Sequence, residues 1–259
     1  MNLFKKTMIG AALAMGIAAS AQATPINVGG VVWDPDNGID FSAASVSIHQ
    51  FIDSITGILS GFGTINSING SSTFCAAGGC ELTFQFGGFT PITGLLPSAT
   101  GSTIQYAGGF VNVFADSTPE AANLDGTTMT QASTGDGALW LALTGHNLPT
   151  GSLVGTVSVD PVTQEVSTLV GSGLLDATGG LALEHFNTNT KADGSDMTFT
   201  NGFTTLLGPV TENPNTQLLE SLGTGNFKGN SIPEPGSLAL LGVGLFGLGT
   251  LRNRRKPQA

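Results

Sequence analysis

The stretch ELTFQFGGF, residues 81–89, alternates apolar and polar side chains with a period of two. Leu82, Phe84 and Phe86 fall on one side of an extended chain, and the intervening Thr and Gln fall on the other. A period of two belongs to β-strands and not to helices. The stretch therefore predicts a strand with one buried face and one face in water.

Similar short runs recur along the chain, separated by Gly, Asn, Asp and Pro, which favour turns. No part of the central region keeps a helical period for three turns between caps. We expect an all-β, Gly/Thr-rich antiparallel body of β-sandwich type, with a β-solenoid as the alternative, although no fixed repeat is visible. The expected strands are Ser47–Ile52, Glu81–Phe86, Ser102–Phe114, Ala138–Leu143, Gly155–Val159, Gly180–Phe186 and Asp196–Phe203.

Charge is distributed unevenly along the 259 residues. All 18 acidic residues lie from Asp34 to Glu234, where Lys191 and Lys228 are the only basic ones, so this region carries a formal charge of −16. A nucleic-acid partner is excluded, because binding phosphates requires clustered Lys and Arg. The 15 Phe residues supply apolar surface for a folded core, which argues against a disordered body.

The first 23 residues have the three-part organisation of a secretory signal peptide. Lys5 and Lys6 precede an apolar run, and Ala21 and Ala23 place small side chains where signal peptidase cuts. We expect an N-terminal signal helix that is removed after Ala23, leaving Thr24 first. The alternative is an uncleaved anchor, but the run is shorter than the roughly 20 residues that span a bilayer.

The last segment, 231–259, also has three parts. Pro233-Glu234-Pro235 predicts an extended, accessible stretch, because proline is excluded from regular helices and central strands. The run 237–251 is apolar on every face and predicts a short transmembrane helix, suited to temporary retention, with a permanent anchor as the alternative. A basic stop on the cytoplasmic side follows: Arg252, Arg254, Arg255 and Lys256.

These three parts in register resemble the PEP-CTERM sorting signal. The resemblance implies recognition by exosortase, a membrane-embedded transpeptidase, removal of the helix, and delivery to the surface or exopolysaccharide matrix of a Gram-negative bacterium. The segments 31–45, 74–89 and 171–190 also resemble stretches of secreted PEP-CTERM proteins, without implying an activity.

Cys75 and Cys80 are the only cysteines, in a chain expected to leave the reducing cytosol. This setting favours a local disulfide over a metal or redox site, which would need further ligands or a two-residue spacing. We expect the bond to stabilise a hairpin-like turn.

Asp34, Asp36 and Asp40 place three carboxylates within seven residues around a glycine. Hard oxygen ligands suit Ca²⁺, but the spacing differs from the EF-hand loop and the sequence is also typical of a solvated turn. We expect a turn and no cofactor, with calcium as the alternative.

The chain has three histidines, His49, His146 and His185. By residue type alone, they could form a hydrolytic triad with Ser172 or Ser195 and Asp176. No G-x-S-x-G or H-E-x-x-H motif supports one. We therefore expect structural histidines and no catalytic residues.

The sequence thus predicts a signal peptide at 1–23, a secreted body at 24–230 and a sorting signal at 231–259. The function that it favours is a non-enzymatic surface or matrix protein. Its expected partners are signal peptidase, exosortase and exopolysaccharide, with transient retention in the inner membrane. A carbohydrate-binding module, stabilised by calcium, is the alternative, and a secreted hydrolase is less favoured.

Overall fold

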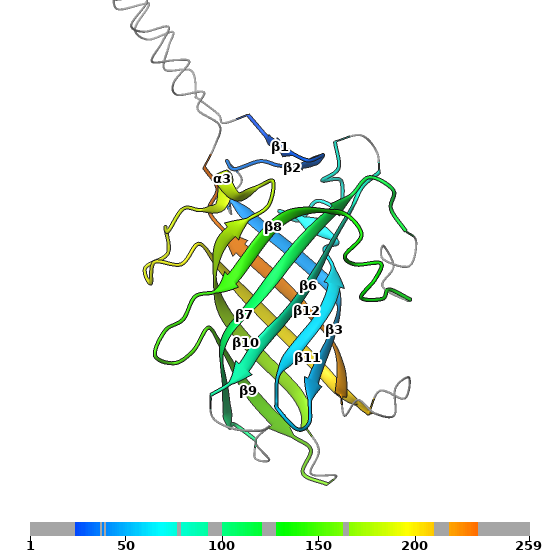
Figure 1. Cartoon of the computed structure of the whole chain (residues 1–259), viewed down its shortest axis with the longest axis vertical. Helices are drawn as coiled ribbons and strands as arrows, with labels where there is room; N and C mark the ends of the chain where they lie inside the picture. The colour runs from blue at the N-terminus through cyan, green and yellow to red at the C-terminus, as the bar shows by residue number, and fades with distance from the viewer. Residues whose placement is uncertain are drawn as a thin grey trace, which may run out of the picture. The chain divides into compact units, whose positions relative to one another are not determined.

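The computed structural model describes residues 24–36, 38, 40–76, 79–92, 100–120, 128–162, 166–209 and 218–232 (Figure 1). These residues form strands and one short helix. The elements are β1 (Ile26–Val28), β2 (Val31–Trp33), β3 (Phe41–Asp53), β4 (Leu59–Thr64), β5 (Ser67–Ile68), β6 (Glu81–Pro91), β7 (Thr103–Asp116), β8 (Ala138–Gly145), β9 (Leu153–Val159), β10 (Val166–Gly179), α3 (Leu183–Phe186), β11 (Met197–Pro209) and β12 (Leu218–Gly229).

The main sheet closes on itself. Its strands are hydrogen-bonded in the order β11-β12-β3-β4-β6-β7-β8-β10, and β10 pairs again with β11 from Thr168–Thr204 to Leu175–Met197. Every pairing is antiparallel, which confirms the predicted all-β antiparallel body. The arrangement is a barrel, however, and not the two facing sheets of a sandwich (Figure 1).

Strands β8 and β9 occupy one position in this barrel wall. The lower-numbered half of β7 pairs with β9 and its other half pairs with β8, and β10 pairs with both in the same way. The residues between them, 146–152, leave the wall as a loop that carries His146. The wall therefore has eight strand positions, the number at which side chains can fill a barrel interior.

Large rings inside the barrel lie over glycines of neighbouring strands. A Cβ added at Gly63 would lie 2.7 Å from the ring of Phe84, and one at Gly61 would overlap the ring of Phe86. These glycines leave the space that the rings fill, so they are needed within strands and not in turns. The same relation joins Gly109 to Phe89, Gly223 to Phe203 and Gly225 to Phe199.

The middle of the interior also holds polar groups. Gln50 donates a hydrogen bond to Ser221, 3.2 Å apart, and the Tyr106 hydroxyl and Asn201 Oδ1 have no partner among the described atoms. Burial raises the pKa of Tyr106 to about 12. Tyr106 and Asn201 line a cavity of about 10 Å³, which is room for about one water molecule.

An aromatic cluster closes the end of the barrel where the β1–β2 hairpin and α3 lie (Figure 1). Trp33 stacks on Phe186 at 5.3 Å and meets Trp140 edge-on at 5.8 Å, while Phe41 packs against Phe186 at 4.6 Å. All four side chains are at most 3% exposed. Their contacts join β2, β3, β8 and α3, so this end has a core of its own.

The predicted strand Gly180–Phe186 is wrong. The chain turns at Gly180, whose φ is +93°, and residues 183–186 form α3. A Cβ at Gly180 would lie 2.6 Å from the carbonyl oxygen of Trp140, and the turn directs Phe186 into the aromatic cluster. The other six predicted runs lie in β3, β6, β7, β8, β9 and β11.

Candidate functional site

A set of hydrogen bonds at the closed end of the barrel holds Ser231 and Ile232, the last residues that the structure describes. Ser231, which is 9% exposed, donates from its backbone N–H to Asp40 Oδ2 at 2.5 Å and from its hydroxyl to Asp40 Oδ1 at 2.6 Å. The indole N–H of Trp33 donates to the same hydroxyl at 3.0 Å. Ser231 is thereby fixed to residues almost 200 positions away in the chain.

The next residue, Ile232, is bound on both sides of its backbone. Its N–H donates to the carbonyl oxygen of His185 at 2.8 Å, and the Nδ1 of His185 lies 3.0 Å from its carbonyl oxygen. The His185 ring also meets Trp33 edge-on at 5.7 Å. We call Trp33, Asp40 and His185, with their bonds to Ser231 and Ile232, the exit clamp.

The three aspartates that suggested calcium have separate roles. Asp34 accepts a hydrogen bond from the backbone N–H of Asp36 at 3.0 Å, as expected of a turn. Asp40 belongs to the exit clamp. These bonds account for two of the three carboxylates, and calcium binding here stays a prediction.

A different set of carboxylates comes together at the start of β6. Oxygens of Glu81, Asp116 and Asp136 lie within 4.8 Å of one another. Glu81 and Asp116 are cross-strand partners, and Glu81 also accepts from the backbone N–H of Glu120 at 2.9 Å. Among the described residues this is the group whose ligand chemistry suits a divalent cation. Its members are far apart in the chain, so no local sequence motif indicates the group.

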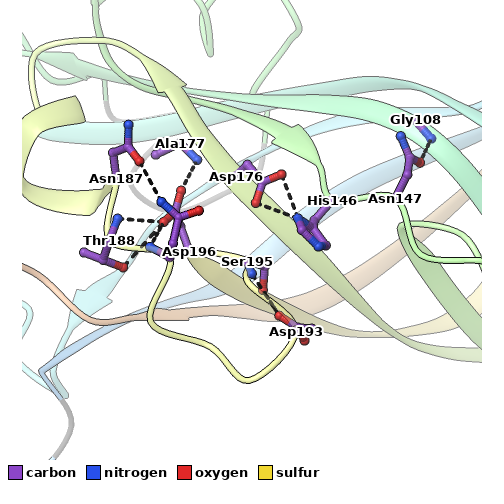
Figure 2. Close-up of polar contacts among 11 residues, drawn as sticks. Gly108, His146, Asn147, Asp176, Ala177, Asn187, Thr188, Asp193, Ser195 and Asp196 are labelled. Atoms are coloured by element: carbon purple, nitrogen blue, oxygen red, sulfur yellow. Dashed lines mark hydrogen bonds and ion pairs between the residues drawn. The ribbon is translucent and has the colours of Figure 1, made fainter.

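Two histidines are paired with carboxylates, one of them on the loop between β8 and β9 (Figure 2). Nδ1 of His146 lies 2.8 Å from Asp176 Oδ2, and this hydrogen bond, with a smaller contribution from the charge of Asp193, raises the pKa of His146. His49 lies 2.7 Å from Glu220 and stacks on Phe62. The expectation of structural histidines stays a prediction, but each of these two has a clear structural partner.

Of the two serines considered for a triad, Ser195 directs its hydroxyl to a carboxylate and not to His146. The hydroxyl of Ser195 donates to Asp193 at 2.6 Å, and this bond, with one from the Ser195 backbone, lowers the pKa of Asp193. Ser172 is exposed on β10. A nucleophilic serine must give its proton to the base, and the Ser195 hydroxyl is directed elsewhere (Figure 2).

Asp196 organises the loop that follows α3. Its buried carboxylate accepts backbone N–H groups of Ala177 at 2.8 Å, Thr188 at 2.7 Å and Asn189 at 2.5 Å (Figure 2). Asn189 has a φ of +50°, which Asn tolerates better than most residues. The carboxylate satisfies otherwise unpaired N–H groups, so it has a structural task.

The predicted disulfide between Cys75 and Cys80 is confirmed. Cys75 also pairs with Val31 of β2, and the Val32 N–H donates to the carbonyl oxygen of Phe74. The disulfide therefore links the segment that pairs with β2 to the residue just before β6. It connects the closed end to the wall, which is more than the stabilisation of one turn.

Several predicted sites lie outside the described residues. No helix among the described residues is long and apolar enough to cross a membrane; the predicted helices at both ends lie outside this part of the chain. The other undescribed sites are Ala21 and Ala23 of the signal cleavage site, the motif Pro233, Glu234 and Pro235, and the basic residues Arg252, Arg254, Arg255 and Lys256.

The described residues form a closed antiparallel β-barrel, and its exit clamp holds Ser231 and Ile232. A family model, described as the PEP-CTERM protein-sorting motif, matches residues 231–256. The chain thus carries a PEP-CTERM sorting motif, which implies export, processing by exosortase and sorting in association with the membrane. No curated protein and no solved structure matches it significantly.

Proposed function

We propose that the barrel is a non-enzymatic structural component of the surface or extracellular matrix of a Gram-negative bacterium. The sorting motif at 231–256 carries this proposal, since such a motif implies export and membrane-associated sorting. The filled interior supports it. Two cavities that described residues line inside the wall are each about 10 Å³, too small for a substrate.

The acidic character of the body fits this role. A strongly negative surface keeps a protein soluble and separate at high local concentration. Signal peptidase acts on the precursor first, the inner membrane retains it through the apolar run, and exosortase releases it. Exopolysaccharide is the partner that it meets after release.

Mass spectrometry of the protein recovered from cells and from the culture matrix tests this route. We expect Thr24 at the N-terminus and loss of the residues that follow the Pro-Glu-Pro motif. A Glu234→Ala variant should keep the tail and stay in the membrane fraction. Recovery of unprocessed wild-type protein from the matrix would contradict the route.

The test of the non-enzymatic role is separate from the test of the route. Purified processed protein should leave polysaccharide, ester and peptide substrates unchanged, and deletion of its gene should change matrix cohesion. If hydrolysis occurs and disappears in a His146→Asn variant, the protein is an enzyme and the proposal is wrong.

The carbohydrate-binding alternative stays a prediction with its own measurement. Glycan arrays probed with and without EDTA would show whether the barrel binds sugar and whether that binding needs calcium. Binding that survives chelation would support a sugar-binding module and reject the requirement for calcium.

A further inference from the structure

The sorting motif and the folded barrel share two residues. The family match begins at Ser231, and Ser231 and Ile232 are the residues that the exit clamp holds. Five hydrogen bonds commit the backbone N–H groups of both residues, the carbonyl oxygen of Ile232 and the hydroxyl of Ser231. These groups are not available to a second partner while the clamp is closed.

The clamp exists only in the folded protein. Trp33 and Asp40 precede Ser231 by 198 and 191 residues, so neither is near it in an unfolded chain. Trp33 is also held by its ring contacts with Phe41, Trp140 and Phe186. The hydrogen bond from Trp33 to Ser231 therefore depends on the aromatic cluster and forms together with it.

The sequence places few residues between the clamp and the apolar run. Residues 233–236 separate Ile232 from the apolar run that begins at Ser237, and four residues span at most about 14 Å when fully extended. Enzymes that act on a peptide commonly bind it as an extended strand through its backbone groups. Opening the clamp would free Ser231 and Ile232 for such binding and lengthen the accessible stretch.

We propose that Trp33, Asp40 and His185 are positioning residues for sorting, which hold Ser231 and Ile232 on the barrel and must release them before exosortase acts. This inference rests on processing by exosortase. The closed clamp keeps the processing rate below its limit, because the enzyme binds only the fraction of molecules in which the clamp is open. The barrel thus regulates its own release from the membrane.

The test measures processing of the full-length chain in a Gram-negative host that also produces an exosortase. Pulse–chase labelling gives the rate, and mass spectrometry gives the cleavage position. Asp40→Ala removes the two hydrogen bonds that the Asp40 carboxylate accepts from Ser231. Since hydrogen bonds to a charged group are the stronger kind, we expect the processing rate to rise at least about fivefold.

A second variant separates access from stability. Eight Gly and Ser residues inserted between Ile232 and Pro233 leave every clamp residue in place but lengthen the free chain by about 25 Å. We expect the rate to rise about as much as with Asp40→Ala, while the melting temperature of the purified protein stays unchanged. A purely structural role for the clamp would not accelerate this variant.

Asp193→Ala is the matched control. Asp193 also accepts hydrogen bonds from the backbone and hydroxyl of a serine, Ser195, but lies outside the clamp. Its variant should be processed at the wild-type rate. If the insertion variant is processed no faster than wild type, the inference is wrong even when Asp40→Ala fails to fold. If the wild-type chain is never processed, the sorting route itself fails.

Discussion

The wall of the barrel and its closed end are built by different rules. In the wall, several large rings lie over a glycine of the adjacent strand, as Phe84 lies over Gly63, and the pairing follows from strand register. At the closed end, Trp33, Phe41, Trp140 and Phe186 meet from four elements that no register relates. The wall is therefore a product of local pattern, whereas the closed end is a product of the completed fold.

This difference shows where the barrel can tolerate change. A ring and the glycine beside it must be changed together. A smaller side chain in place of the ring leaves a cavity, and a larger one in place of the glycine overlaps the ring. The closed end is held by indole and phenyl contacts together with the polar clamp, so its loss should be more gradual. The following variants test that contrast in order of expected effect.

The largest effect should come from Phe84→Ala in the wall. Phe84 is fully buried, and its truncation should lower the free energy of unfolding by about 3–5 kcal/mol. Urea unfolding followed by fluorescence measures the change. Phe84→Leu is the control and should cost clearly less, since it keeps most of the volume; equal losses would mean that the space over Gly63 does not need filling.

A smaller effect is expected from Ser231→Ala at the closed end. The variant leaves the buried indole N–H of Trp33 and one oxygen of Asp40 without their partner, at a cost of about 2–3 kcal/mol. Thermal unfolding of the purified protein measures it. Because the ring contacts remain, the near-ultraviolet circular dichroism of the tryptophans should persist, and its disappearance would show that the clamp and the aromatic cluster are not separable.

Removing the disulfide should cost about 2 kcal/mol by the loop-entropy relation. The double variant Cys75→Ser with Cys80→Ser leaves the wall intact but frees the segment around Cys75 that pairs with Val31 of β2. Hydrogen exchange should therefore rise first in β1 and β2. Uniform exchange throughout the barrel would show that the bond stabilises the wall as much as the closed end.

The smallest effect concerns pH. Because Asp176 raises the pKa of His146 in the folded state, its contribution to stability is fully present below the ordinary pKa of 6.5 and is lost as pH rises through the raised value. The pair is partly exposed, so the change should be about half a kcal/mol. Urea unfolding between pH 5 and pH 9 measures it, and His146→Asn should remove that part of the pH dependence.

Much of the wall could be predicted from the sequence, because a period of two is a local signal. The runs in β3, β6 and β7 carry it clearly. Of the wall strands, β4, β10 and β12 were missed. In β4 and β12, Gly61, Gly63 and Gly225 resemble turn residues until their neighbouring rings are seen. The sorting motif and the disulfide could also be predicted, because each is contained in one short segment.

The closed end and the sites around it could not be predicted. Asp40 meets Ser231 across 191 residues, and Glu81 meets Asp116 only because β6 pairs with β7 in that register. Residues 180–186 were predicted as a strand because the run is apolar, whereas tertiary contacts of Phe186 determine its conformation. Relations of this kind depend on the closed barrel and leave no local pattern.

The closure of the barrel also has a consequence for the proposed location in a crowded matrix. Each strand of the barrel wall has hydrogen-bonded neighbours on both sides, so the described residues of the wall leave no whole strand unpaired to which another copy could add. We therefore expect neighbouring molecules to stay individual units rather than grow into fibrils, however densely they accumulate. Any cohesion among them must come from side chains or from the polymer around them.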